Sequence, residues 1–139
     1  MDASELVEKY KAGERNFRGV ILPGIDLSYG DLEKIDLQGA KLVGANLFGA
    51  NLMDANLSEA DLAMANLGEA SMSRANLTKA DLRNANLSQA YFEEADFSGA
   101  NLTNADLSGA FLFKANLETA IMKGTIMIKA YTLDAKFPS

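Results

Sequence analysis

Carboxylates are the residues of this chain with the widest chemical scope, because the 139-residue sequence contains neither histidine nor cysteine. Without histidine the chain lacks the commonest general base and metal ligand, and without cysteine it has no disulfide or thiolate zinc site. Among the acidic residues, the pair of most interest is Asp61 and Asp81. Two carboxylates held side by side could share a proton or bind a cation. Whether they meet depends on the elements that carry them.

A repeat of five residues dominates the sequence. From Ala40 to Ala120 every fifth residue is alanine, and two positions after each alanine stands a large apolar residue, most often leucine. The residue between them is mostly Asn or Asp, and two further residues complete the unit A-(N/D)-L-x-x. Neither an α-helix nor a flat strand keeps a period of five on one side. The chain must therefore bend once per unit to bury both apolar classes.

Each unit has a predicted orientation. The alanine and the leucine point inward, and the residue between them occupies an outward slot. The last two residues form a corner, and glycine stands in the second corner position of several units. Glycine suits the left-handed third residue of a type II turn. We expect another turn type where Glu, Asp, Lys or Arg stands in that position.

The stretch AKLVGANLFGANLMDANLSEADLAMANL resembles the pentapeptide-repeat family, whose consensus is A(D/N)LXX, and the resemblance runs from about Phe17 to Phe137. It implies an all-β fold, a right-handed quadrilateral β-helix with four units per coil. Residues 15–139 would form this β-helix in about six coils, a rod roughly 30 Å long at ~4.8 Å per coil. With residues 1–14 as a cap, the chain is expected to be a single domain.

The first fourteen residues predict a short capping α-helix over the first coil. Asp2 followed by Glu5 matches a capping box, and Gly13 would end the helix. The first units carry larger residues at the alanine position, which indicates a wider first coil packed against the cap; they are Val20, Ile25 and Ile35. A detachable helix that binds a partner is the alternative.

Stacking every twenty residues predicts which side chains share a surface. Central positions form the core, represented by Leu42, Leu62, Leu82, Phe92, Phe97 and Leu102. Three outward slots on one side hold rings that would form a column: Tyr91, Phe111 and Tyr131. Phe113 and Leu133 occupy the first corner position beside that column. Outward positions of the last coils hold Ile121, Ile126 and Ile128.

These outward apolar residues predict a protein–protein interface, with another protein or with a second copy of the chain. The resemblance favours self-association, because members of the family often dimerise through their C-terminal ends. Two alternatives remain open at this point. The stacked rings could simply stabilise one side of the coil, as cross-strand pairs do, or the C-terminal tail could fold back over them.

Catalysis is not expected. A rod with a filled core offers no concave site where groups of matched pKa converge, and no phosphate loop, metal-ligand cluster or triad is present. Asp61 and Asp81 would stack in neighbouring coils, but Lys41 and Arg83 beside them favour a solvated charged surface over a shared proton or a bound cation. No cofactor, metal or small-molecule substrate is therefore expected.

Charge bears on a second possible function. Some pentapeptide-repeat proteins resemble B-DNA in shape and charge, bind DNA gyrase and thereby confer fluoroquinolone resistance. A ~30 Å duplex carries ~18 negative charges, whereas residues 15–139 hold 15 acidic and 11 basic side chains, a net charge of −4. The most acidic side is interrupted by Lys34, Arg74 and Lys114. Gyrase binding is thus the disfavoured alternative.

The remaining expectations concern partners and location. The whole chain has a net charge of −6, which argues against direct nucleic-acid binding. It has no signal-peptide core and no apolar run long enough for a membrane span, so we expect a soluble, cytoplasmic protein. The sequence as a whole predicts a non-catalytic structural or protein-interaction module.

Overall fold

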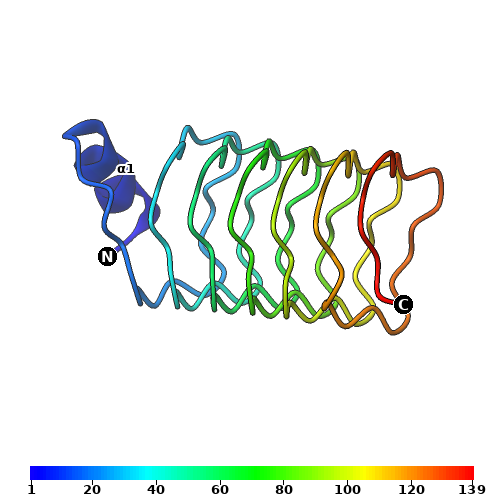
Figure 1. The fold of residues 1–139 in the computed structure, drawn as a ribbon. Coiled ribbons are helices and arrows are strands. Elements are labelled where there is room, and N and C mark those ends of the chain that lie inside the picture. Colours follow the sequence, from blue (N-terminus) through cyan, green and yellow to red (C-terminus); the bar gives the residue numbers. More distant parts are fainter.

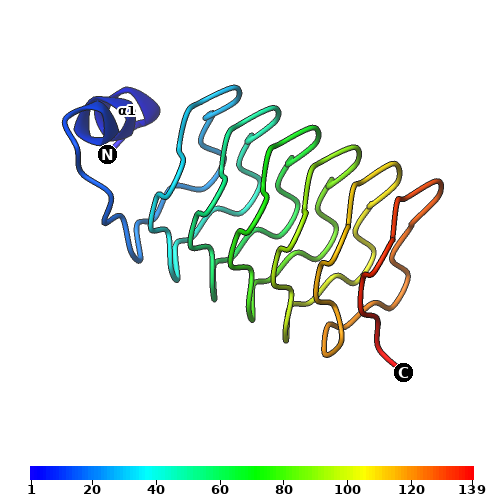
Figure 2. The same cartoon turned by 45° about the horizontal axis from the view of Figure 1, so that its top comes forward.

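Residues twenty apart in the sequence lie side by side throughout the computed structural model, which describes every residue from Met1 to Ser139. Parallel β-bridges join them from Asn16–Asp36 to Asn116–Lys136, so four five-residue units make one coil. The coils stack into a rod with the two chain ends at opposite ends (Figures 1 and 2). The one helix, α1, spans Ala3–Lys11, and the β-structure consists of isolated bridges. No helix here has the length and apolarity that a bilayer crossing requires.

Three backbone hydrogen bonds per side hold each coil to the next. On the side that carries Tyr91, the N–H of Phe92 donates to the carbonyl of Phe111 (2.7 Å), and that of Glu94 donates to Phe113 (2.9 Å). The N–H of Phe111 donates back to Ala90 (2.9 Å). Each unit therefore bonds to the coils on both sides of it, which satisfies the backbone in a chain without long strands.

The core follows the five-residue period. The alanines from Ala40 to Ala120 and the apolar residues two positions after them, as far as Leu117, are buried. The six residues named as core from the sequence have no exposed surface: Leu42, Leu62, Leu82, Phe92, Phe97 and Leu102. Phe92 and Phe97 pack with their ring centroids 5.1 Å apart. The small alanine side chains occupy the inward positions with the least space, and the larger apolar side chains fill the centre of the coil.

The corners correct one prediction from the sequence. Charged residues at the second corner position adopt the same left-handed conformation as glycine: φ is +58° at Glu59 and Lys79, against +67° at Gly39. The turn closes in the same way, for example through the Ala60 N–H and the Leu57 carbonyl (3.1 Å). The expectation of another turn type at charged corners is therefore wrong. A left-handed residue costs about 1–2 kcal/mol, and the inter-coil bonds that this conformation aligns offset that cost.

Thr119 is the exception among the corners. It is absent from the left-handed residues, as expected for a β-branched side chain. In the other coils of this column the second-corner N–H donates to a carbonyl above it, as Lys79 does to Ser98 (2.9 Å). Gly99 instead donates its N–H to the Thr119 hydroxyl (3.0 Å). The threonine side chain thus replaces the backbone acceptor that its own conformation removes.

Asn and Asp in the outward slots have a defined structural task. Every one of them accepts a hydrogen bond through Oδ1 from the N–H two residues later, at the first corner position. Examples are Asn46 with Phe48 (3.1 Å) and Asp106 with Ser108 (2.9 Å). This bond holds the start of each corner in an Asx-turn. The Asn/Asp preference of the repeat is therefore explained by the corner that follows.

Helix α1 lies across the N-terminal end of the stack (Figure 1). Asp2 caps it by accepting from the Glu5 N–H (2.9 Å), which is one half of a capping box. Leu6 is fully buried, and the hydroxyl of Tyr10 donates to the Glu33 carbonyl of the first coil (2.8 Å). The guanidinium of Arg15 lies 3.7 Å from the centre of the Tyr10 ring. These contacts fasten α1 to the open edge of the first coil.

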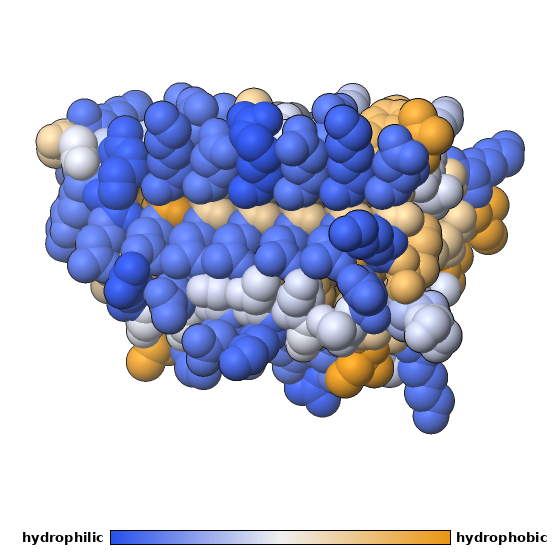
Figure 3. Space-filling model, viewed as in Figure 1, coloured by the Kyte–Doolittle hydropathy of each residue, from blue (hydrophilic) through white to orange (hydrophobic).

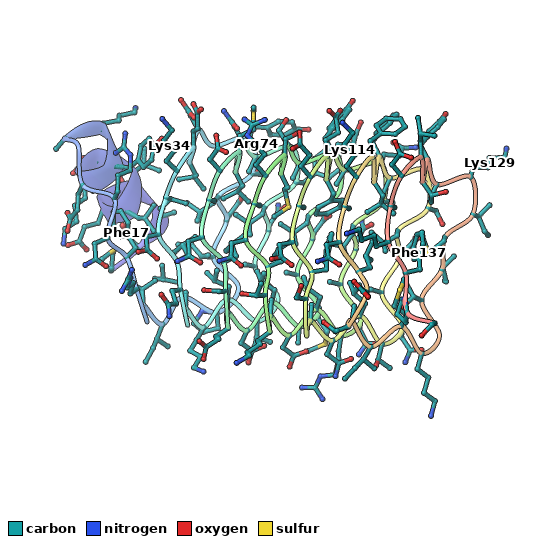
Figure 4. The ribbon with its side chains drawn as sticks, viewed as in Figure 1. Phe17, Lys34, Arg74, Lys114, Lys129 and Phe137 are labelled. Atoms are coloured by element: carbon teal, nitrogen blue, oxygen red, sulfur yellow. The ribbon has the colours of Figure 1, made fainter.

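One edge of the rod carries charges of alternating sign. The second corner positions that follow the Tyr91 side read, coil after coil, Lys34, Asp54, Arg74, Glu94, Lys114 and Asp134. Figure 4 shows Lys34, Arg74 and Lys114 in one row along this edge. Arg74 and Asp54 form an ion pair (2.8 Å), and its hydrogen bond lowers the pKa of the Asp54 carboxyl. We call these six residues the alternating charge row.

Substitution of Gly39 separates backbone strain from crowding, because a Cβ there would meet no atom within 4 Å. Gly39→Val should lower the free energy of unfolding by about 2 kcal/mol, since a β-branched residue resists positive φ. Gly39→Asn should cost less than about 1 kcal/mol, since Asn tolerates this region. Urea unfolding followed by circular dichroism measures both. Equal losses in the two variants would contradict the strain argument.

Replacement of Arg74 should change how Asp54 titrates. In Arg74→Gln the pKa of Asp54 should rise toward its ordinary value of 3.8, because the hydrogen bond from Arg74 is the main cause of its depression. A depressed carboxyl pKa stabilises the fold above pH 3.8 and ceases to do so as the pH falls through the lowered value. Carboxyl-carbon NMR titration measures the shift. Arg83→Gln is the control and should leave the Asp54 pKa unchanged.

Candidate protein-interaction surface

Tyr91, Phe111 and Tyr131 form a column of parallel rings on one side of the rod. The ring centroids are 4.8 Å apart between Tyr91 and Phe111 and 4.7 Å apart between Phe111 and Tyr131. The ring planes differ by only 3° and 1°. Backbone bridges between the same residues set this spacing, so the ladder of the coil dictates the stacking. We call these three residues the aromatic column.

Phe113 and Leu133 extend the column into a wider surface. The Phe113 ring lies 6.3 Å from that of Phe111 and 6.4 Å from that of Tyr131, tilted by about 45° from both. Leu133 is 69% exposed, Tyr131 is 51% exposed and Tyr91 is 42% exposed, whereas the two phenylalanines are half-buried by their neighbours. We call these five residues the aromatic patch. Hydrophobic atoms gather toward the C-terminal end of the rod in Figure 3.

A shallow groove runs beside the aromatic column, a feature that the sequence did not indicate. Its lining combines the three rings with the neighbouring corner row, and its volume is about 360 Å³. Gly109 leaves this row without a side chain at the level of Phe111. Lys129 and Glu69 bring opposite charges to the same groove. An apolar side chain of a partner could therefore contact the ring edges while polar groups flank it.

The three isoleucines named from the sequence lie apart from the aromatic patch. Ile121, Ile126 and Ile128 are all exposed, on the two sides of the coil that precede the patch. The corner residue Lys129 and the inward-pointing Ala130 separate them from Tyr131 along the chain. Exposed Ile21, Tyr29 and Met64 lie elsewhere on the rod. The structure thus brings together five of the eight predicted interaction residues.

The residues of the aromatic column cannot make the corner hydrogen bond that Asn and Asp make in the outward slots. With Tyr91, Phe111 and Tyr131 in the slots, no Oδ1 is available to the N–H groups two residues later. Those N–H groups, on Glu93, Phe113 and Leu133, have no acceptor within the chain. In three successive coils on one side, an aromatic ring therefore stands in place of the side chain that would accept the corner hydrogen bond.

The acidic pair singled out at the outset is part of a salt-linked surface. Asp61 and Asp81 are joined by a bridge in neighbouring coils, and Asp81 accepts from Arg83 at 2.6 Å. The hydrogen bond from Arg83 lowers the pKa of the Asp81 carboxyl, so this carboxylate holds its charge more firmly than an isolated one. That is the opposite of what proton sharing requires. No three acidic side chains are grouped where they could hold a metal ion.

Comparisons with known proteins place these features in a family. The family model described as pentapeptide repeats (8 copies) matches residues 31–62, 50–89 and 80–118. Among solved structures, the pentapeptide repeat protein Rfr23 of the cyanobacterium Cyanothece 51142 is similar over 96% of this chain and 98% of its own, with 25% identity and a TM-score of 0.60. Among curated proteins, none matches the chain significantly.

Two further solved structures are similar. A pentapeptide repeat protein of the Arabidopsis thaliana thylakoid lumen is 33% identical over 70% of each chain, with a TM-score of 0.43. QnrB1, a plasmid-mediated fluoroquinolone resistance protein, is 20% identical over 89% of this chain and 73% of its own, with a TM-score of 0.45. The family match and the likeness to Rfr23 imply a right-handed quadrilateral β-helix. With its unbroken five-residue period and twenty-residue coil, the chain belongs to the pentapeptide-repeat family.

Proposed function

We propose that this protein is a non-catalytic interaction module, a rigid right-handed quadrilateral β-helix that binds another protein or a second copy of itself through the aromatic patch. The observation that carries the proposal is the exchange at the aromatic column. Tyr91, Phe111 and Tyr131 replace the corner-bonding Asn or Asp in three successive coils. Most other outward slots hold Asn or Asp and the coil continues through them, so the fold does not require the rings.

The shape of the aromatic patch supports binding. Its rings are held in parallel by the backbone ladder, so little side-chain entropy remains to be lost when a partner arrives. Aromatic residues are enriched at the centres of protein interfaces, where they supply contact area. Leu133 and Tyr131 are more than half exposed, which leaves apolar surface that stacking within the chain does not use.

Stabilisation of one side of the rod is the competing interpretation. Stacked aromatic pairs contribute roughly 0.5–1.5 kcal/mol beyond their buried area, so the column must add something to stability. That role accounts for Tyr91, Phe111 and Tyr131 but not for Leu133, whose side chain is mostly in water. A partner surface would bury Leu133 and the ring edges together, which favours the interaction role.

The double substitution Phe111→Ser with Phe113→Ser tests this function. Both residues are half-buried surface residues outside the core, so the rod should stay folded while the aromatic patch loses its centre. If the wild type self-associates, the variant should no longer show the rise of mass with concentration in sedimentation velocity. If the wild type instead captures a partner from its host extract, the variant should fail to capture it. Mass spectrometry would identify that partner.

The matched control is Tyr29→Ser with Phe48→Ser. These rings also contact each other on the surface, at 5.7 Å, but they lie outside the aromatic patch. The control should associate like the wild type. If all three proteins keep the same mass and capture the same partners, the aromatic patch is not an interface.

DNA gyrase binding remains the alternative that the family suggests. Ion pairs that neutralise acidic side chains count against it, such as Arg74 with Asp54 and Arg18 with Asp36. A DNA mimic needs uncompensated negative charge along its length. We expect no inhibition of gyrase supercoiling at micromolar protein, and inhibition at that concentration would favour this alternative over the aromatic patch.

A further inference from the structure

The two ends of the rod present complementary rows of backbone groups. Six N–H groups of the last coil that stand where earlier coils donate to the coil above have no acceptor in the chain: those of Met122, Gly124, Met127, Lys129, Thr132 and Asp134. Five carbonyls of the first coil that stand where later coils accept from the coil below receive no hydrogen bond in the chain: those of Ile21, Pro23, Asp26, Ser28 and Asp31. Leu102 donates to the Ile121 carbonyl at 2.7 Å. If a second rod followed in the same register, Met122 would donate to Ile21 of that rod in the same way.

The alternating charge row supports this register. It begins with Lys34 in the first coil and ends with Asp134 in the last. A second rod stacked in register would place its Lys34 one coil above Asp134, and the alternation would continue without interruption. The pair would have the spacing at which Arg74 and Asp54 form an ion pair within the chain.

A second column matches at the same junction. Its outward slots hold Ile21 at the first coil, polar residues in the four coils between, and Ile121 at the last coil. Both isoleucines are exposed in the single chain, Ile21 by 75% and Ile121 by 53%. Head-to-tail stacking would bring them into contact and remove both from water.

The last five-residue unit of the chain, residues 135–139, has the same position within a coil as the first unit, residues 15–19. Residues 135–139 read AKFPS and would occupy the same quarter of the junction coil as residues 15–19, RNFRG, of the next copy. Both units carry phenylalanine at the central position. Phe17 is 2% exposed, whereas Phe137 is 36% exposed. Phe137 of one copy could therefore take the buried place of Phe17 in the next.

Helix α1 obstructs this junction in the single chain. It packs Leu6 onto the first coil, and its Tyr10 hydroxyl occupies the Glu33 carbonyl. That carbonyl is the acceptor that the Asp134 N–H of a preceding copy would use. Displacement of α1 together with residues 15–19 would open the edge.

We propose that the rod joins head to tail with further copies of itself, and that α1 with residues 15–19 is the releasable element that holds it apart. The partner is a second copy of this chain, bound through the rod ends and not through the aromatic patch. The contact is heterologous, so it produces an open series of oligomers and not a closed dimer. The exchange of residues 135–139 for 15–19 makes it a strand swap.

Substitution of Leu6 by glutamate tests the proposal, because a charge in this buried position should detach α1. The Leu6→Glu chain should form a concentration-dependent series in sedimentation velocity, with a weight-average mass that rises past twice that of the monomer. Ser4→Glu adds the same charge at an exposed position of α1. This control should sediment like the wild type.

The register is tested in the Leu6→Glu background. Ile121→Lys or Ile21→Glu alone should reduce the assembled fraction, because each places a charge against an isoleucine of the neighbouring copy. Both together should restore it, because the two charges would then face each other. Phe111→Ser with Phe113→Ser in the same background should leave the series intact, which separates this junction from association through the aromatic patch.

Three outcomes would overturn the proposal. The first is a folded Leu6→Glu chain with the mass of the wild type, and the second is an assembly that stops at the dimer. The third is an assembled fraction that Ile121→Lys and Ile21→Glu, alone or together, leave unchanged. If Leu6→Glu chains do not fold, Tyr10→Ala replaces them with the same expected results. It removes the Glu33 bond and the ring beside Arg15 without burying a charge.

Discussion

The hydrogen bond between residues one coil apart is the interaction on which everything else in this molecule depends. It requires that four units return the chain to the same line, and each unit must then turn by the same amount. That requirement imposes a left-handed residue at nearly every corner, including Glu59 and Lys79. The left-handed conformation costs about 1–2 kcal/mol per corner. The inter-coil hydrogen bonds offset this cost, because an irregular corner would misalign the hydrogen bonds to the coils above and below it. Thr119 shows the tolerance of the system, since its hydroxyl supplies the missing acceptor for Gly99.

The same ladder turns a one-dimensional sequence into an ordered surface. Any residue is followed at a fixed rise by the residue twenty positions later, so short sequence changes become columns. The aromatic column, the alternating charge row and the Asx bonds are three examples. Each arises from substitutions at fixed positions of the five-residue unit. The residues that depart from Asn or Asp in the outward slots therefore decide which surfaces the rod presents.

The register and the core were predictable from the sequence because the five-residue period leaves few ways to bury both alanine and leucine. The column of Tyr91, Phe111 and Tyr131 followed from the same period. The conformation at charged corners was not predictable, because propensity argues against Glu or Lys at positive φ and the opposing term comes from neighbouring coils. The half-burial of Phe111 and Phe113 and the groove beside Gly109 depend on ring orientation, which the spacing of residues does not determine.

The direction of the inter-coil hydrogen bonds has a mechanical consequence. These bonds point along the rod axis, because each joins a coil to the coil above it. A tensile force applied along the axis would pull directly against them, with no covalent segment crossing the gap except the single chain connection from coil to coil. A force across the axis would meet the covalent backbone of every turn. The rod should therefore resist being flattened across its axis yet yield coil by coil when stretched, since each coil is coupled only to its neighbours.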